Sequence, residues 1–456
     1  MTEPGPSRSG NNPSSGPAIG IEPRRLASLI IDDVISRRLA LDDTLDACLA
    51  GPIGHRLEDR DKGLVRAIAT TAIRHFGIIS KSLTTRFERG MPIHSGPLEA
   101  ILTGGVAQIL YLEVPDHAAV DLTVRLVQAD PDCRRYVALS NAILRRIARE
   151  KAEIVEAARS LEDDTPAWLA DRWIASYGLE TAQKIADAQN HDCAVDITVK
   201  ADPEAWAERL DALVLPTGSL RLKTREPIPS LPGYAEGEWW VQDAAAALPA
   251  KLIAAQQNEK IADFCAAPGG KTVQLAVSGA AITAIDRSGK RLQRLKSNLA
   301  RLHLEAEVIE KDALLYEGGP FDAILVDAPC SATGTIRRHP DVAWTKGPED
   351  LRKLILLQAR LLDKAASLLK VGGRLVYCTC SLEPEEGENQ IAALLERNPN
   401  LKRAPFTSAD LPAFAGPLAD AVTALGELRT LPFMLPHEEN RLSGLDGFFA
   451  SRLIAS

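Results

Sequence analysis

Residues 261–272 read IADFCAAPGGKT, a short apolar run that passes into a glycine turn and then into the start of a helix. Gly269 and Gly270 let the backbone approach a ligand closely, and a helix that begins there presents unpaired N–H groups. Strands that lead into such turns are typical of α/β sheets, which bind ligands beyond the carboxyl ends of their strands. The stretch therefore predicts an α/β domain with a ligand site at this turn.

Two phosphate-binding alternatives do not fit the turn. Gly270-Lys271-Thr272 matches the end of a P-loop, but that loop needs a glycine five positions before Gly270, where this chain has Cys265. The dinucleotide pattern GxGxxG is absent as well. The turn could also have a purely structural role.

The chain after residue 242 alternates short apolar runs with helical stretches, which predicts a mostly parallel sheet with right-handed crossovers. The expected strands are residues 260–264, 281–285, 307–309, 323–326 and 374–377. Asp286 ends the second strand and Asp312 follows the third, where carboxylates are placed to bind ribose hydroxyls and an adenine amino group. Each of the two could instead cap a helix. Because Asp286 and Asp312 follow successive strands of one predicted sheet, together they favour a nucleoside cofactor.

Acidic and thiol side chains follow the last two of these strands. Residues 321–335 (FDAILVDAPCSATGT) place Asp327 and Cys330 past the fourth strand, and residues 371–381 (VGGRLVYCTCS) end the fifth with Cys378 and Cys380. We expect Cys330 and Cys380 to approach each other across the mouth of the sheet. Cys378 faces the same side as Cys380 and is interpreted as a small buried apolar residue.

The motifs CAAPGGK (265–271), DAPCS (327–331) and TCS (379–381), with residues 334–344 after Cys330, resemble the RsmB/Sun family of RNA 5-methylcytosine methyltransferases. The resemblance implies a Rossmann-like domain that uses S-adenosylmethionine. It implies cofactor contacts from the residues Cys265, Ala266, Ala267, Pro268, Gly269, Gly270, Lys271, Asp286, Asp312 and Asp327.

The same resemblance assigns the catalytic roles. Cys380 would attack carbon 6 of cytosine, because a thiolate added there makes carbon 5 nucleophilic. Cys330 would assist the elimination that frees the product, and Asp327 would hydrogen-bond the base. In DNA cytosine methyltransferases the cysteine of the Pro-Cys motif attacks instead, so Cys330 is the alternative nucleophile.

The remaining chain predicts a multidomain protein. Residues 1–20, rich in Gly, Pro and Ser, read as a disordered tail. Residues 21–155 form an all-α bundle that resembles the NusB-like RNA-binding domain, with helical runs at 24–31, 60–68 and 136–149 and breaks at Pro92 and Pro131. Residues 160–240 read as a small α+β connecting domain, and 241–456 as the Rossmann-like methyltransferase domain.

Composition and charge limit the kinds of binding partner that the sequence predicts. The net charge is −8, and the acidic excess lies after residue 150, so RNA binding must come from local basic groups. Arg337 and Arg338 beside the catalytic turn, and Arg287 and Arg291 on a basic helix, are the candidates for RNA contacts. The sequence shows no apolar run that could span a membrane, no signal peptide and no metal motif, and we expect a cytoplasmic monomer.

The expected activity is therefore S-adenosylmethionine-dependent RNA cytosine-5 methylation, with 16S ribosomal RNA as the first candidate substrate. Transfer RNA and DNA are the alternative substrates. A protein of another class, a non-catalytic RNA-binding assembly factor built on an inactive methyltransferase, is the third possibility, against which the intact Asp327, Cys330 and Cys380 argue.

Overall fold

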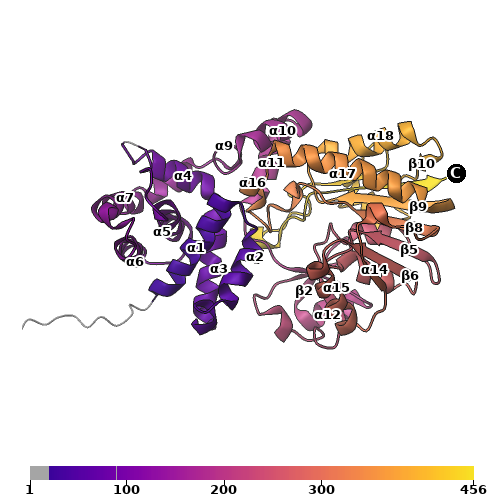
Figure 1. Ribbon diagram of the computed structural model, residues 1–456, viewed down its shortest axis with the longest axis horizontal. Coiled ribbons are helices and arrows are strands. Elements are labelled where there is room, and N and C mark those ends of the chain that lie inside the picture. The colour runs from indigo at the N-terminus through magenta and orange to yellow at the C-terminus, as the bar shows by residue number, and fades with distance from the viewer. Residues whose placement is uncertain (1–19, 89) are drawn as a thin grey trace, which may run out of the picture. The chain divides into compact units, whose positions relative to one another are not determined.

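The computed structural model describes residues 20–88 and 90–456, which form two compact units, 1–158 and 159–456 (Figure 1). The disordered tail predicted for residues 1–20 falls almost entirely on residues 1–19, outside the described residues. Residues 160–240 and 241–456 lie in the same unit, so their division into two domains remains a prediction.

The first unit is helical, as expected. Its α-helices are α1 (Ile21–Arg37), α2 (Leu41–Ala50), α3 (Asp59–Arg74), α4 (Phe76–Thr84), α5 (Leu98–Tyr111), α6 (Asp116–Ala129), α7 (Val137–Arg149) and α8 (Lys151–Ala157). The predicted helical runs are confirmed by α1, α3 and α7, and both predicted breaks fall between helices. Helix α5 is buried along most of its length and contacts α1, α3, α6 and α7, because it is apolar on nearly all sides.

The second unit begins with helices and a small antiparallel sheet. The helices are α9 (Ser160–Asp163), α10 (Ala167–Tyr177), α11 (Leu179–Gln189) and α12 (Pro203–Leu210). The strands β1 (Asp196–Val199), β2 (Ala212–Val214), β3 (Leu220–Leu222) and β4 (Trp239–Val241) pair in the order β2-β3-β1-β4. These helices and strands agree with the mixed α and β character predicted for residues 160–240.

The larger sheet has the order β10-β12-β9-β8-β5-β6-β7, with β11 paired to β12. Its strands are β5 (Lys260–Phe264), β6 (Ala281–Asp286), β7 (Glu307–Glu310), β8 (Phe321–Asp327), β9 (Leu369–Thr379), β10 (Leu401–Arg403), β11 (Leu428–Thr430) and β12 (Phe448–Ala455). The five strands from β5 to β9 pair in parallel, and β10, β11 and β12 add an antiparallel edge. All five predicted strands are confirmed, and the strand order reverses between β5 and β8.

Two apolar layers cover this sheet, and the alternation of side chains along each strand separates them. On β8, Ile324 and Val326 pack with Leu361 and Leu362 of α17 (Pro348–Ser367) and with residues of α18 (Glu388–Arg397). On the opposite face, Leu325 packs with residues of α13 (Leu248–Leu252) and α14 (Gly270–Ala276). The remaining helices, α15 (Gly289–Arg301) and α16 (Val342–Thr345), follow β6 and β8.

The small sheet contains a buried ion pair, and the contribution of this pair to the free energy of unfolding can be measured. Arg221 donates two hydrogen bonds to Asp196, of 2.7 and 2.8 Å, and neither side chain is more than 1% exposed. Arg221→Ala would leave the Asp196 carboxylate buried without its partner, so we expect a loss of about 3–5 kcal/mol in the free energy of unfolding. The fluorescence of the neighbouring Trp239 and Trp240 during urea unfolding measures this loss.

The exposed pair of Arg225 and Asp192 is the matched control, with side chains 73% and 62% exposed. Arg225→Ala should cost less than about 1 kcal/mol. Equal losses in the two variants would contradict the assignment of stability to the buried pair.

Candidate active site

The glycine turn follows β5, and its shape requires glycine. Gly269 adopts φ 108° and Cys265 adopts φ 62°, both in the left-handed region. A Cβ atom added at Gly269 would lie 2.8 Å from Cγ of Leu295 on α15. Any larger residue at position 269 would therefore clash with α15 as well as strain the backbone.

The end of β6 holds this turn in place. Asp286 is buried, and its Oδ2 accepts a hydrogen bond from the backbone N–H of Ala267 at 3.2 Å. The guanidinium of Arg291 donates to the carbonyl oxygen of Ala267. The Arg291 side chain is still 53% exposed, so its RNA contact stays a prediction.

Three carboxylates gather around the turn: Asp263, Asp286 and Asp327. Asp263 is fully buried; its Oδ2 accepts a hydrogen bond from Thr272 at 2.6 Å, and its Oδ1 has no partner within the described part of the chain. Burial raises the pKa of Asp263 to about 7, with the charge of Asp327 adding to the effect and the Thr272 hydrogen bond opposing it. A cationic ligand would relieve the repulsion within this cluster.

Lys271 places one positive charge beside this cluster of carboxylates. Its Nζ donates to Oδ2 of Asp327 at 2.8 Å and lies 5.0 Å from the centre of the Phe448 ring. Burial alone would lower the pKa of Lys271, but Asp327 and the thiols Cys378 and Cys380 raise it above its usual value. Lys271 therefore remains an ammonium ion beside the carboxylate and the thiols.

The two predicted catalytic thiols meet. Sγ of Cys330 and Sγ of Cys380 lie 3.4 Å apart, which confirms the expected approach across the mouth of the sheet. Cys378 is buried against the apolar layer beneath β9, as expected, but its Sγ also donates to Oδ1 of Asp327 at 3.5 Å. Burial and the charge of Asp327 raise the pKa of Cys378, so it stays a thiol.

A cavity of about 620 Å³ opens over these groups. Its floor includes Asp327, Lys271 and Cys380, and the turn residues Ala266, Pro268, Gly269 and Gly270 form one side. Trp240, Asn298 and Arg301 line the side toward the small sheet and α15. Of the three thiols at these strand ends, Cys380 alone is among the described residues that line the cavity. Cys380 is therefore the one of these three thiols that a ligand in the cavity would meet.

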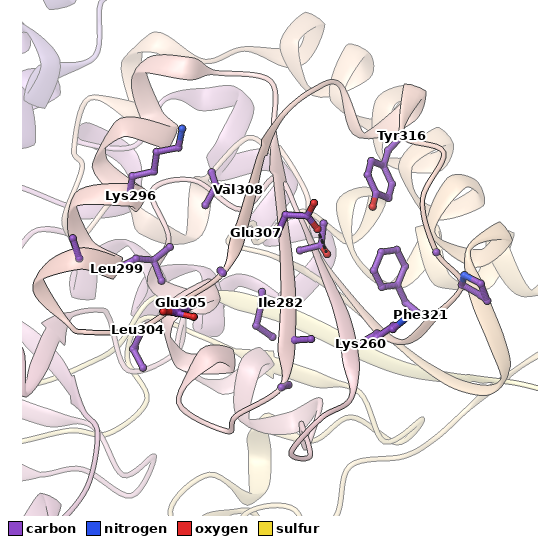
Figure 2. Close-up of a pocket in the computed structure, with 17 residues that line it drawn as sticks. Lys260, Ile282, Lys296, Leu299, Leu304, Glu305, Glu307, Val308, Tyr316 and Phe321 are labelled. Atoms are coloured by element: carbon purple, nitrogen blue, oxygen red, sulfur yellow. Dashed lines mark hydrogen bonds between the residues drawn. The ribbon is translucent and has the colours of Figure 1, made fainter.

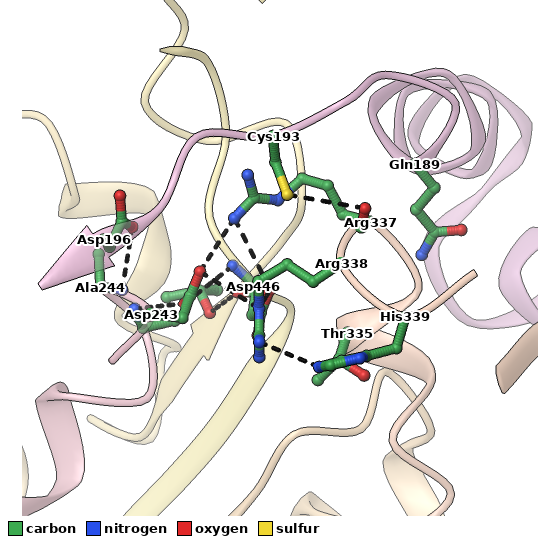
Figure 3. A network of polar contacts seen from close by, with 12 residues as sticks. Gln189, Cys193, Asp196, Asp243, Ala244, Thr335, Arg337, Arg338, His339 and Asp446 are labelled. Atoms are coloured by element: carbon green, nitrogen blue, oxygen red, sulfur yellow. Dashed lines mark hydrogen bonds and ion pairs between the residues drawn. The ribbon is translucent and has the colours of Figure 1, made fainter. Parts of the chain in front are cut away.

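Of the two arginines that follow the Cys330 loop, Arg337 is not available for RNA. Arg337 is 2% exposed, and its Nη2 lies 2.9 Å from Oδ2 of Asp243. Arg338 donates to both carboxylate oxygens of Asp446, although it also lines the cavity (Figure 3). The predicted phosphate contact of Arg337 is corrected, because the guanidinium neutralises carboxylates inside the unit.

Two other predicted residues lie at the surface. Asp312 is exposed, and its Oδ1 accepts from the backbone N–H of Leu314 at 2.9 Å, capping the short helix η4 (Ala313–Leu315). It is not among the described residues that line the cavity. Arg287 is exposed just before α15, so its predicted RNA contact is sterically open.

The sequence did not indicate several polar residues of the site. Asp263 lies within residues 261–272, but nothing in the sequence assigned it a role. Asp243 and Asp446 are far from every motif. Glu386, a buried carboxylate that binds the backbone of Ser331, was also missed. The acidic run that follows Cys380, EPEEGEN at 383–389, was the signal for Glu386, but acidic runs usually lie in solvent.

A second cavity, of about 1040 Å³, lies at the opposite edge of the sheet (Figure 2). Lys260, Ile282 and Phe321 line it from the amino ends of β5, β6 and β8. None of the predicted catalytic or cofactor residues is among the described residues around it. Since ligands of open α/β sheets bind at the carboxyl ends, this cavity is not the candidate site.

Within residues 20–88 and 90–456, no helix is both long and apolar enough to cross a membrane. The same residues contain no group of three or more His, Cys, Asp or Glu side chains arranged to hold a metal ion.

Comparison with known proteins identifies both units. Residues 250–454 match the family described as 16S rRNA methyltransferase RsmB/F, and residues 21–149 match the NusB family. The ribosomal RNA small subunit methyltransferase B of Xylella fastidiosa is 35% identical over 452 residues, covering 95% of this chain and 98% of that protein. The protein of the same name from Cronobacter sakazakii is 33% identical over 399 residues, covering 83% and 90%.

A solved structure, the crystal structure of PH0851, shares the fold with a TM-score of 0.71 at 22% identity, covering 94% of this chain and 98% of that one. The glycine turn, the paired thiols and the sequence relatives all point to the same family. This chain belongs to the RsmB/Sun family of S-adenosylmethionine-dependent ribosomal RNA methyltransferases.

Proposed function

We propose that this protein methylates carbon 5 of a cytosine in 16S ribosomal RNA, with Cys380 as the nucleophile. The observation that carries the proposal is the 3.4 Å contact of Cys330 and Cys380 beside the Asp327–Lys271 pair, at a cavity that Cys380 lines. The names of the relatives favour small-subunit ribosomal RNA over transfer RNA and DNA.

The turn and the carboxylates fit S-adenosylmethionine, which supplies an electrophilic methyl group when bound. The residues that would hold it are those from Cys265 to Lys271, with Asp286 and Asp327, and with Asp312 reaching it from the exposed segment after β7. Oδ1 of Asp263, which has no hydrogen-bond partner among residues 20–88 and 90–456, supports this fit, because a buried carboxylate among two others favours a cationic ligand. Asp286 keeps free lone pairs for ribose hydroxyls, since a carboxylate accepts about four hydrogen bonds and those it accepts here come from backbone N–H groups.

The attack requires Cys380 as a thiolate, the nucleophilic form of the side chain, and the Lys271 ammonium lines the same cavity. Its sulfur forms a bond to carbon 6, and the electrons of the C5=C6 double bond move through the ring to N3, which takes a proton from water. Asp327 accepts hydrogen bonds from N3–H and the exocyclic amino group, and so stabilises the charge that develops. Carbon 5 is then enamine-like and can take up the methyl group.

Elimination restores the aromatic base. The proton on carbon 5 leaves to water, its electron pair re-forms the C5=C6 bond, and the C6–S electrons return to Cys380. N3 then returns to water the proton that it took up, which leaves neutral 5-methylcytosine. Cys330 assists this departure from 3.4 Å away. Cys330 is less suited to the initial attack, because it is not among the described residues that line the cavity.

RNA contacts are proposed for the exposed basic side chains at the start of α15, Arg287 and Lys290. They lie in the same unit as the active site, and phosphate contacts there would position the strand. The target base must leave its stack to reach the cavity, so the substrate is a loop or single strand.

The function is tested by bisulfite sequencing of ribosomal RNA from cells with and without the gene. We expect one cytosine of 16S RNA to lose its protection when the gene is absent and to regain it with the wild-type copy. Purified protein with labelled S-adenosylmethionine should label RNA and not DNA. Labelled DNA, or unchanged protection in ribosomal RNA, would contradict the proposal.

Replacement of Cys380 and replacement of Cys330 should have different effects on the reaction. Cys380→Ala should lower methyl transfer by at least ~10³-fold, because the covalent route is lost. Cys330→Ala should accumulate a protein–RNA adduct that survives denaturing electrophoresis, since the thiolate leaves slowly. Cys48→Ala, in the first unit, is the control and should behave as wild type. An adduct in Cys380→Ala would make Cys330 the nucleophile.

Cofactor affinity should depend on pH through Asp263, whose pKa lies at about 7. Below this pH the carboxyl is neutral, and above it the carboxylate attracts a cation, so binding should tighten by up to ~10-fold per unit as pH rises toward the pKa. Calorimetric titration with S-adenosylmethionine from about pH 6 to about pH 8 measures this change. Asp263→Asn should flatten the profile, and identical profiles would exclude Asp263 as the titrating group.

The proposed RNA surface can be measured through salt dependence. In Arg287→Ala/Lys290→Ala, the slope of log K against log salt for a single-stranded RNA should fall by about 0.7 for each phosphate that the variant no longer neutralises. The exposed Arg360 of α17 provides the control variant, Arg360→Ala, with an unchanged slope expected. Equal slopes in all three proteins would place the RNA elsewhere.

A further inference from the structure

A buried carboxylate lies behind Cys330. Glu386 ends the short helix η6 (Pro384–Glu386) and is fully buried. Its Oε1 accepts from the backbone N–H of Ser331 and from Nε2 of Gln358, both at 2.9 Å, and its Oε2 accepts from Oγ of Ser331 at 2.5 Å. Every one of these partners is a donor, and the carboxylate oxygens accept from all of them.

These contacts fix the loop that carries Cys330. Ser331 follows the cysteine and binds Glu386, whereas Pro329 precedes it and accepts a hydrogen bond from Gln358 at 2.9 Å. Oγ of Ser331 also lies 3.1 Å from Oγ of Ser381, the residue after Cys380. The backbone on both sides of Cys330 is therefore held, and the serines that follow the two cysteines are joined.

The two thiols have opposite electrostatic surroundings. Cys330 is faced by Cys380, by Glu386, by the backbone N–H of Ala332 and by the hydroxyl of Tyr377. The hydrogen bond to Cys380, burial and the charge of Glu386 raise the pKa of Cys330, and the Ala332 N–H only partly offsets them. Cys380 instead shares the cavity with the Lys271 ammonium.

We propose that Glu386 is a positioning residue that keeps Cys330 a neutral thiol with its S–H directed at Sγ of Cys380. This inference rests on the proposed function, in which Cys380 must be a thiolate both before attack and on departure. The S–H of Cys330, 3.4 Å away, donates a hydrogen bond to that thiolate in both states. Glu386 thus assigns different roles to two chemically identical side chains.

The test measures alkylation of each cysteine by iodoacetamide against pH, resolved by mass spectrometry, in the full-length protein without RNA or cofactor. Glu386→Gln keeps the shape and removes the charge, so the Cys330 profile should move down by about one pH unit, with ~10-fold faster alkylation below its midpoint. Ser331→Ala keeps the charge and removes one hydrogen bond, and its Cys330 profile should stay within about twofold of wild type. The exposed Glu396 of α18 supplies the matched control, Glu396→Gln, with no change expected.

An unchanged Cys330 profile in folded Glu386→Gln, or an equal shift in Ser331→Ala, would overturn the proposal. Tryptophan fluorescence and the melting temperature report whether each variant is folded. If Glu386→Gln does not fold, the wild-type protein decides, because Cys380 must then ionise at a lower pH than Cys330, and coincident profiles would overturn the proposal. No readout depends on methyl transfer, so the inference can fail while the proposed function stands.

Discussion

Everything at the site depends on the parallel pairing of β5, β8 and β9. Parallel neighbours end at the same edge of a sheet, so the turn after β5, the Asp327 loop after β8 and Cys380 after β9 are brought together although more than a hundred residues separate the first from the last. The reversal of strand order at β5 and β8 leaves room above them. The Lys271–Asp327 ion pair and the thiol contact both form in that space.

Charge balance inside the second unit explains how an acidic chain can hold so many buried ionic groups. Arg337 and Arg338 neutralise Asp243 and Asp446, and Arg221 neutralises Asp196. An isolated buried charge is costly, so each of these arginines is committed to a partner. This commitment removes the buried Arg337 from the proposed RNA contacts and leaves exposed groups such as Arg287 as candidates.

The three thiols of the site show how surroundings divide the work among identical side chains. Cys378 is part of the apolar layer and supports Asp327 through a hydrogen bond. Cys330 is held beside the carboxylate of Glu386, and Cys380 faces the cavity near Lys271. Burial and neighbouring charge, rather than residue type, decide which sulfur is suited to be the thiolate.

The sequence alone determined the helical first unit, the five parallel strands and the meeting of Cys330 with Cys380, because apolar periodicity and strand-end motifs are local signals. It could not determine that Arg337 is buried against Asp243 or that Arg291 binds the carbonyl oxygen of Ala267, because each depends on what a distant segment places beside the side chain. Asp243, Asp446 and Glu386 escaped prediction for the same reason. Partners that are far apart in sequence are chosen by packing, and only the tertiary structure decides which charges are desolvated and paired.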